Sequence, residues 1–350
     1  MKMNTTLLFL LAPLMISVFT GSASADAADL TLVGSYDTDG FSHGIFVSDG
    51  YAYIADHANG LVIVDVSDPA APTLAGGYNT IDYARDVAVS GDYVYVADYG
   101  NGLDIFDVSD PAATTFEGYY ESNHTLGIVV SGGYAYVADQ YDGLVIIDVS
   151  DPTAPELVGN CSTNGSSFGI AVLDDYAYIA DNLNGLAIVD ISDPTAPAVV
   201  GNCDTAGRAV AVAVSGSYAY IADHTNGLVI IDVGNPAAPA IGGSCDTSGL
   251  ALGLTVSDGC AYIADYTNGL VVIDVSDPSD PTIAGTYNST SDARDAAVSN
   301  GYVYVTNGNY GLAVFHPDVP ENGGEVPEFP TIALPIVAMI GLAFVFRKRE

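Results

Sequence analysis

The chain has 350 residues, of which 43 are Asp or Glu and 7 are Lys or Arg, and its formal net charge is −36. A surface this acidic repels the phosphates of nucleic acid, so we expect no nucleic-acid partner. Apolar residues make up 49% of the chain, which is enough for a large core. We interpret the excess acid as Asp-rich turns, with adaptation to a salty environment as the alternative.

The first 25 residues have the three parts of a secretory signal peptide. Lys2 supplies the positive charge of the N-terminal region, Leu7 to Phe19 is the apolar region, and Ala23-Ser24-Ala25 is a small-residue cleavage site. We therefore expect the mature chain to begin at Asp26 and to lie outside the cytoplasm.

A phrase close to YAYIAD, followed by one close to GLVIVDVSDP, occurs seven times along the body of the chain. The copies begin at Tyr51, Tyr93, Tyr134, Tyr176, Tyr218, Cys260 and Tyr302. A period of 41 or 42 residues fits either helical repeats or four-stranded propeller blades. Short Val, Ile and Tyr runs, separated by Asn-Gly and Ser-Asp-Pro, favour strands.

One unit predicts four strands, at Arg85–Gly91, Tyr93–Asp98, Gly102–Ser109 and around Thr114–Tyr120. The second and third are apolar on both faces, whereas a sheet with one wet face would alternate. Each sheet is therefore expected to be covered on both sides, as blades stacked around an axis would be.

The first segment of the body supports ring closure. Leu30–Tyr36 has no partner of its own and resembles Pro281–Tyr287, the fourth strand of the sixth unit. The seventh unit lacks its fourth strand after Phe315. We therefore predict an all-β, seven-bladed propeller over residues 26–316, with four antiparallel strands per blade and the N-terminal strand closing the ring.

The repeat resembles a known family. GLVIVD at Gly60–Asp65 is similar to the LVIVD-repeat β-propellers of archaeal and bacterial surface proteins, and YVYVTN at Tyr302–Asn307 is similar to the YVTN propeller repeat. The resemblance implies a surface scaffold with no general catalytic motif. The residues themselves show no Ser/His/Asp order, phosphate-binding glycine loop or metal-ligand spacing, so we predict no enzyme and no cofactor.

The shared Asp-x-x-Asn-Gly segment is predicted to be the turn between the second and third strands. Asn59-Gly60 would supply the positive φ angles, and Asp56 would accept backbone N–H bonds within the turn. A calcium site is the alternative, although Ala58 stands where a calcium loop needs an oxygen ligand.

Four cysteines are interpreted as small buried side chains. Cys161, Cys203 and Cys245 occupy one repeat position, and Cys260 replaces a repeat tyrosine. A Cys245–Cys260 disulfide is the alternative, which spacing alone does not decide.

The candidate site lies where each fourth strand passes to the next first strand, because these loops differ between the units. At one position the seven units carry, in order, His43, Arg85, Leu126, Phe168, Val210, Leu252 and Arg294. Closure makes Arg294, His43 and Arg85 neighbours at one side of the channel mouth, with Asp86 and Asp295 beside them. We hypothesise a pocket for an anionic group such as a carboxylate-bearing sugar. The alternative is that each arginine only neutralises an adjacent or facing aspartate.

Other polar residues carry weaker expectations. The remaining histidines, His57, His124, His224 and His316, are interpreted as surface residues. Four sequons have the form of glycosylation acceptors, at Asn123, Asn160, Asn164 and Asn288.

The C-terminal end has the composition of a linker followed by an anchor. Residues 317–330 are rich in Pro, Gly and Glu, and residues 331–350 are an apolar run ending in Arg347-Lys348-Arg349. As a helix, Thr331 to Phe346 would span about 24 Å at 1.5 Å per residue, short of a hydrocarbon core of about 30 Å.

This end resembles the PEF-type sorting signal of archaeal surface proteins. The matching residues are Pro327, Glu328, Phe329 and Pro330. The resemblance implies an archaeosortase-like processing enzyme as a partner and a surface anchor at the C-terminus.

We therefore expect an extracellular, surface-anchored propeller that acts as a structural, adhesion or interaction module. Its partner would be an envelope protein or glycan, and its C-terminal segment would contact the membrane. Two alternatives remain: a polysaccharide-acting enzyme with Asp86 and Asp295 at the channel mouth, or a cation-binding coat protein.

Overall fold

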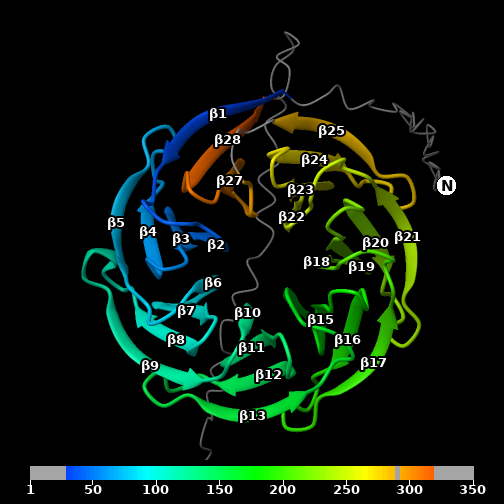
Figure 1. Cartoon of the computed structure of the whole chain (residues 1–350), viewed down its shortest axis with the longest axis horizontal. Coiled ribbons are helices and arrows are strands. Elements are labelled where there is room, and N and C mark those ends of the chain that lie inside the picture. Colours follow the sequence, from blue (N-terminus) through cyan, green and yellow to red (C-terminus); the bar gives the residue numbers. More distant parts are fainter. Residues whose placement is uncertain (1–28, 288–291, 319–350) are drawn as a thin grey trace, which may run out of the picture.

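The computed structural model describes residues 29–287 and 292–318. Within them, seven four-stranded antiparallel sheets are arranged around a central axis (Figure 1). The prediction of a seven-bladed β-propeller is confirmed. The expected signal peptide, Asn288, the sorting motif and the anchor segment lie outside the described residues.

The strands of the blades have the following bounds. Blade one contains β2 (Ile45–Ser48), β3 (Tyr51–Ala55), β4 (Leu61–Asp65) and β5 (Thr73–Tyr78). Blade two contains β6 (Ala84–Ser90), β7 (Tyr93–Asp98), β8 (Gly102–Asp107) and β9 (Thr115–Glu121), with the 3-10 turn η1 (Pro111–Ala113) before β9. Blade three contains β10 (Thr125–Ser131), β11 (Tyr134–Asp139), β12 (Gly143–Asp148) and β13 (Glu156–Cys161). Blade four contains β14 (Ile170–Leu173), β15 (Tyr176–Ala180), β16 (Leu186–Asp190) and β17 (Ala198–Cys203). Blade five contains β18 (Ala211–Ser215), β19 (Tyr218–Ala222), β20 (Leu228–Asp232) and β21 (Ala240–Cys245). Blade six contains β22 (Gly253–Ser257), β23 (Cys260–Ala264), β24 (Leu270–Asp274) and β25 (Thr282–Tyr287). Blade seven contains β26 (Asp295–Ser299), β27 (Tyr302–Thr306), β28 (Leu312–Asp318) and β1 (Asp29–Tyr36).

The blade-two strands agree with their predicted positions to within two residues at each end. The two central strands, β7 and β8, are buried along nearly their whole length. β28 runs through Asp318, two residues into the segment expected to be a linker.

The core is divided into one hydrophobic cluster at each interface between neighbouring blades. At the interface of blades two and three, Leu103 and Ile105 pack with Val137 and Ile147. Six equivalent clusters complete the circle. Because both faces of every sheet are buried in this way, β7 and β8 need apolar side chains at successive positions rather than at alternate ones.

The ring is closed by strands from opposite ends of the body. β1 pairs antiparallel with β28, with Leu32 opposite Phe315 and a bulge between Leu32 and Gly34. Every other outer strand has a bulge at the corresponding place. The predicted closure by the N-terminal strand is therefore confirmed, and residues 29–318 contain both halves of the closing pair.

The outer strands of blade seven and of blades one to five lie against the proline turn of the next blade. A Cβ atom added to Gly76 would lie 1.8 Å from the carbonyl oxygen of Pro111. Glycine is needed at this position because the carbonyl of the neighbouring turn occupies the space of a side chain. The repeated glycine and the repeated proline are thus two sides of one contact.

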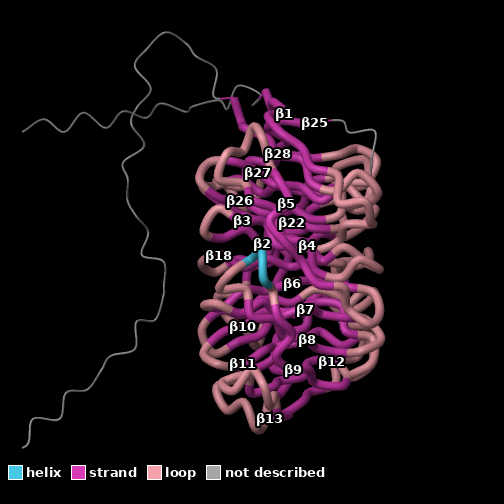
Figure 2. The backbone as a smooth tube through the Cα atoms, turned by 90° about the vertical axis from the view of Figure 1, so that its left-hand side faces the viewer, coloured by secondary structure: helices cyan, strands magenta, loops and turns pink. Residues whose placement is uncertain are grey.

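The strands fill the middle of the disc, and the turns and loops gather on its two faces (Figure 2). The Asp-x-x-Asn-Gly turns share one face with the loops that lead into β2, β6, β10, β14, β18, β22 and β26. Backbone bridges join the two kinds of loop, for example His57 to Ala84 and His224 to Ala251. We call this side of the ring the mouth face.

The turn aspartates are structural. Asp56 is fully buried and accepts hydrogen bonds from the Thr38 hydroxyl at 2.9 Å and the Asn59 amide at 3.0 Å. Side chains rather than the expected backbone N–H groups therefore satisfy Asp56. The positive φ angles fall on His57 and Gly60 rather than on Asn59.

The four cysteines are free thiols, each half-buried. The alternative of a Cys245–Cys260 disulfide is thus not realised. Cys245 packs at the interface of blades five and six, whereas Cys260 packs at the interface of blades six and seven.

Candidate ligand-binding site

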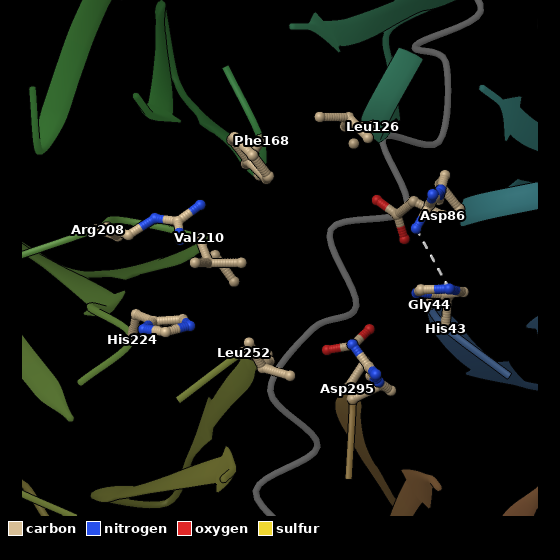
Figure 3. A pocket seen from close by; sticks show the side chains of 16 residues that line it. His43, Gly44, Asp86, Leu126, Phe168, Arg208, Val210, His224, Leu252 and Asp295 are labelled. Atoms are coloured by element: carbon tan, nitrogen blue, oxygen red, sulfur yellow. Dashed lines mark hydrogen bonds between the residues drawn. The ribbon is translucent and has the colours of Figure 1, made fainter. Parts of the chain in front are cut away.

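The innermost strands enclose a cavity of about 300 Å³ at the mouth face (Figure 3). Each blade contributes a residue within two positions of the start of its innermost strand. These seven residues, which we call the inner ring, are His43, Arg85, Leu126, Phe168, Val210, Leu252 and Arg294. The position that varies most conspicuously between otherwise similar repeats is therefore the position that lines the cavity.

The residue after each inner-ring position packs against the neighbouring innermost strand. It is glycine or alanine in five blades, and it is aspartate in blades two and seven. A Cβ atom added to Gly44 would lie 2.5 Å from an oxygen of Asp86 and 2.8 Å from its Cα. The small residue lets the backbones approach, and the backbone N–H of Gly44 donates to the carbonyl of Arg85 at 3.1 Å.

The Arg85 guanidinium is held by His43 and Tyr99. Its Nη1 lies 3.3 Å from Nε2 of His43, and its Cζ lies 5.3 Å from the centre of the Tyr99 ring. Burial, and then the nearby Arg85 and Arg294, lower the pKa of His43 to about 3. His43 is consequently neutral and accepts a hydrogen bond from Arg85.

The Arg294 guanidinium lies between two aromatic rings. Its Cζ is 4.8 Å from the centre of the Phe41 ring and 5.1 Å from that of Tyr266. Asp292 lies 3.8 Å away, near the limit for an ion pair. Ring faces stabilise a cation without using its N–H donors.

Asp86 and Asp295 bridge adjacent blades. Asp86 accepts the N–H of Val87 at 2.8 Å and of Ile128 in blade three at 2.9 Å. Asp295 accepts the N–H of Ala296 at 2.9 Å and of Ile45 in blade one at 3.2 Å. Both oxygens of each carboxyl group therefore hold backbone in place.

The two carboxyl groups are hard to ionise together. Burial raises the pKa of Asp86 to about 6. Burial, and then the neighbouring Asp86 carboxylate, raise the pKa of Asp295 to about 8. Near neutral pH this pair therefore carries less than its full negative charge.

The arginines are not neutralised by the aspartates that follow them in the chain. Within residues 29–287 and 292–318, no ion pair joins Arg85 to Asp86 or Arg294 to Asp295. The Nε atoms of Arg85 and Arg294 are both buried without a hydrogen-bond partner among the described residues. Pairing of each arginine with the aspartate that follows it is therefore not what the structure has, whereas a facing aspartate, Asp292, does lie 3.8 Å from Arg294.

Sequence analysis missed two members of the cavity wall. Arg208 and His224 also line the cavity, on the side opposite His43 and Asp86 (Figure 3). Arg208 donates from Nε to the Asn182 side chain at 3.2 Å. The signal was available, because Arg208 is the third arginine of the body and lies two residues before the inner-ring residue Val210.

The mouth face around the cavity carries exposed apolar side chains. Leu183, Tyr141 and Tyr310 lie in the Asp-x-x-Asn-Gly turns or their blade-seven equivalent and are 70%, 66% and 61% exposed. His57, expected on the surface, is half-buried and stacks on Tyr83 with ring centres 3.9 Å apart. The face thus has apolar contact surface as well as charge.

Three of the predicted glycosylation acceptors are accessible. Asn123, Asn160 and Asn164 are exposed. Asn123 and Asn164 lie in loops of the mouth face, and Asn160 lies on the outer strand β13. Their modification stays a prediction.

Two searches of the described residues found nothing. No group of three or more His, Cys, Asp or Glu side chains in residues 29–287 and 292–318 is placed to hold a metal ion. Within the same ranges, no helix is long and apolar enough to cross a bilayer.

The LVIVD repeat model matches residues 39–80, 82–122, 123–163, 164–205, 206–247, 248–289 and 291–315. The chain belongs to the LVIVD repeat family. A second model, the PEF-CTERM archaeal protein sorting domain, matches residues 326–350. The two matches bear out the LVIVD and PEF resemblances seen in the sequence, and a sorting signal of this kind indicates a protein of the cell surface. The YVTN resemblance stays a prediction. No curated protein matches the chain.

Several solved propellers are similar to this LVIVD protein in fold alone. The WD40 domain of Neurospora crassa Pan2 has a TM-score of 0.66 at 12% identity, covering 83% of this chain and 96% of that one. The computationally designed Ika8 protein has a TM-score of 0.61 at 7% identity, covering 81% of this chain and 99% of that one. BamB from Moraxella catarrhalis has a TM-score of 0.56 at 13% identity, covering 83% and 98%. Identities this low carry no functional inference.

Proposed function

We propose that this protein is a cell-surface interaction module that binds an anionic group of an envelope glycan or protein in the mouth of its channel. The observation that carries the proposal is the convergence of Arg85, Arg208 and Arg294 on one cavity. The full chain has only 7 basic residues against 43 acidic ones, and the described part holds no other Lys or Arg. An anion would find its strongest attraction at this cavity.

The state of the guanidinium groups supports the same assignment. Burial lowers the pKa of both Arg85 and Arg294 from the usual value, so each charge is held at a cost. Their buried Nε donors have no partner in the part of the chain that the structure describes. An anionic group in the cavity would offset this cost by accepting those hydrogen bonds.

The location of the protein supports a role in binding at the cell surface. We propose that a sortase-like enzyme processes the PEF-CTERM segment, residues 326–350, and leaves the propeller tethered by its C-terminus. The signal peptide expected in the first 25 residues would deliver the chain to that enzyme. A rigid ring with variable loops on one face suits the display of a binding site.

We further propose that the cavity binds its ligand without hydrolysing it. Asp86 and Asp295 are the carboxyl groups that an enzyme would use there, and each already accepts two backbone N–H bonds. A general acid or nucleophile must instead be free to contact the reacting atoms. These aspartates are better suited to fixing the blades around the site.

The test is binding of the propeller, residues 26–318, to acidic glycans and to envelope fractions. We expect glucuronate-bearing glycans to bind, and the Arg85→Gln/Arg294→Gln double variant to bind them at least tenfold more weakly, because it loses two charge-assisted donors. The corresponding neutral glucose-bearing glycans are the control ligands. Equal binding of charged and neutral glycans, or unchanged binding by the double variant, would contradict the proposal.

A further inference from the structure

The inner ring is divided into two continuous arcs. Blades seven, one and two contribute Arg294, His43 and Arg85, whereas blades three to six contribute Leu126, Phe168, Val210 and Leu252. In Figure 3, Phe168 and Val210 lie across the cavity from His43, on the same side as Arg208 and His224. The inner ring therefore has one arc with the cationic Arg294 and Arg85 and one apolar arc, and Arg208 and His224 line the cavity beside the apolar arc.

The apolar arc is not explained by the core. Leu126, Phe168, Val210 and Leu252 belong to none of the seven clusters that bury the interfaces between blades. All four are half-buried and face the cavity. Apolar side chains that line a cavity without packing into the core provide contact area for an apolar guest.

The charged side has room for one anionic group. Arg85 and Arg294 both have an unpartnered buried Nε, and they flank the neutral His43. Arg208, on the other side, already donates its Nε to Asn182. Among the described residues, the buried arginine N–H donors without a partner therefore lie on the side of Arg85 and Arg294.

The volume limits the size of the guest. About 300 Å³ lies at the small end of ligand cavities, which accommodates a single small molecule or one terminal residue of a chain. A longer glycan could insert only one end.

We infer that the preferred occupant is a carboxylate with an apolar body: its carboxylate lies against Arg85 and Arg294, and its aliphatic or aromatic part lies against Leu126, Phe168, Val210 and Leu252. This inference rests on the proposed anion-binding role and names the ligand class more closely. A sugar acid satisfies the arginines, but its hydroxyl groups would lose water against these four side chains, which offer no hydrogen-bond partner and leave Arg208 and His224 as the polar groups of that side. An aliphatic or phenyl group loses no hydrogen bonds there.

The experiment compares carboxylates that differ only in their bodies. Dissociation constants of acetate, butyrate, hexanoate, phenylacetate and glucuronate are measured by displacement calorimetry on the propeller, residues 26–318. Each buried methylene should strengthen binding about fourfold. Hexanoate should therefore bind at least tenfold more tightly than acetate and more tightly than glucuronate.

Variants separate the two sides of the cavity. Phe168→Ser and Leu252→Ser should weaken the increase in affinity with the length of the carboxylate's alkyl chain. They should change acetate affinity by no more than about twofold and leave the fold intact, because neither side chain contributes to the core. Arg85→Gln/Arg294→Gln should weaken every carboxylate. Leu183→Ser, a matched change on the mouth face outside the cavity lining, should change nothing.

A comparison of two ligands identifies the source of the carboxylate. N-acetyl-leucine, with its amide as control, imitates the C-terminus of a peptide, whereas hexanoate imitates a free acid. Tighter binding of N-acetyl-leucine than of hexanoate assigns the site to a chain end, and the reverse assigns it to a free acid.

Two results would overturn the inference. The first is equal affinity for acetate and hexanoate, together with tight, arginine-dependent binding of glucuronate. It would contradict the preference for an apolar body but would agree with the proposed function. Failure of every carboxylate, glucuronate included, to bind the wild-type propeller would remove both.

Discussion

The interfaces between blades and the inner ring follow opposite rules, although both are built from the same repeats. At the interfaces, every blade uses nearly the same side chains, such as Leu61, Leu103 and Leu144 at one position. In the inner ring, equivalent positions hold residues as different as Arg85 and Phe168. The difference shows that stability requires uniformity at the interfaces, whereas the channel mouth is free to specialise.

The largest expected effect comes from removing an interface strand. A chain beginning at Asp37 lacks β1. β28 then loses its outer neighbour, and the cluster between blades seven and one loses Val33 and Tyr36. We expect loss of most of the free energy of unfolding and association of the exposed edge. Thermal melting and size-exclusion chromatography would measure this against a chain beginning at Asp29. A monomeric variant with an unchanged melting temperature would show that the ring does not depend on its closure.

A smaller effect is expected where the inner ring meets the interfaces. Gly44→Ala places a Cβ atom 2.5 Å from Asp86 Oδ1 and 2.8 Å from its Cα, so blade one must move away from blade two. We expect a loss of about 2 kcal/mol in the free energy of unfolding, measured in urea. Blade five already carries Ala211 at this position, so Ala211→Gly is the matched control and should cost less than about 1 kcal/mol. Similar values for the two variants would mean that this contact is not tight.

The smallest expected effect is a gain in stability, at a buried interface position where blade two has an aspartate and other blades have valine. Asp104 is 2% exposed at a position that holds Val62, Val145, Val229 and Val271 in other blades. Burial, and then the neighbouring Asp98 carboxylate, raise the pKa of Asp104 to about 7. We expect Asp104→Val to raise the free energy of unfolding at pH 8 by about 1 kcal/mol, since a costly buried charge is removed.

The pH dependence checks this explanation. The folded-state pKa of Asp104, about 7, lies above the usual carboxyl pKa of 3.8. Protonation therefore favours the folded state, and the stability that it contributes is present below pH 4 and lost as the pH rises through 7. The wild-type stability should fall from pH 4 to 8, and that of Asp104→Val should fall less. The reverse change, Val145→Asp in blade three, should steepen the fall, and parallel profiles for all three proteins would reject the explanation.

The blades and their closure could be predicted because they depend on contacts that recur. Apolar residues at successive positions in Tyr93–Asp98 predict a strand covered on both faces, and Leu30–Tyr36 matches the outer strand of another unit. The prediction that Arg294, His43 and Arg85 lie near one another followed from closure of the ring alone, since it needs only the order of the blades. Their role as a ligand site remains a prediction.

Other features needed the three-dimensional arrangement. Arg208 lies before β18 and His224 follows β19, and only the folded ring shows that both line one cavity, although the position of Arg208 near Val210 was a hint. The bonds of Asp86 and Asp295 to the blade that follows each in the ring could not be predicted either, because those partners lie about 40 residues or more away in sequence.

By itself the sequence determined the repeat, the number of blades, the closing strand and the surface address, because these depend on local patterns and on the order of units along the chain. The tertiary structure decided that the buried Nε atoms of Arg85 and Arg294 lack a partner among the described residues, and that cationic and apolar side chains line different parts of the inner ring. Those properties arise from distances between side chains of different blades, which depend on how closely the innermost strands approach one another.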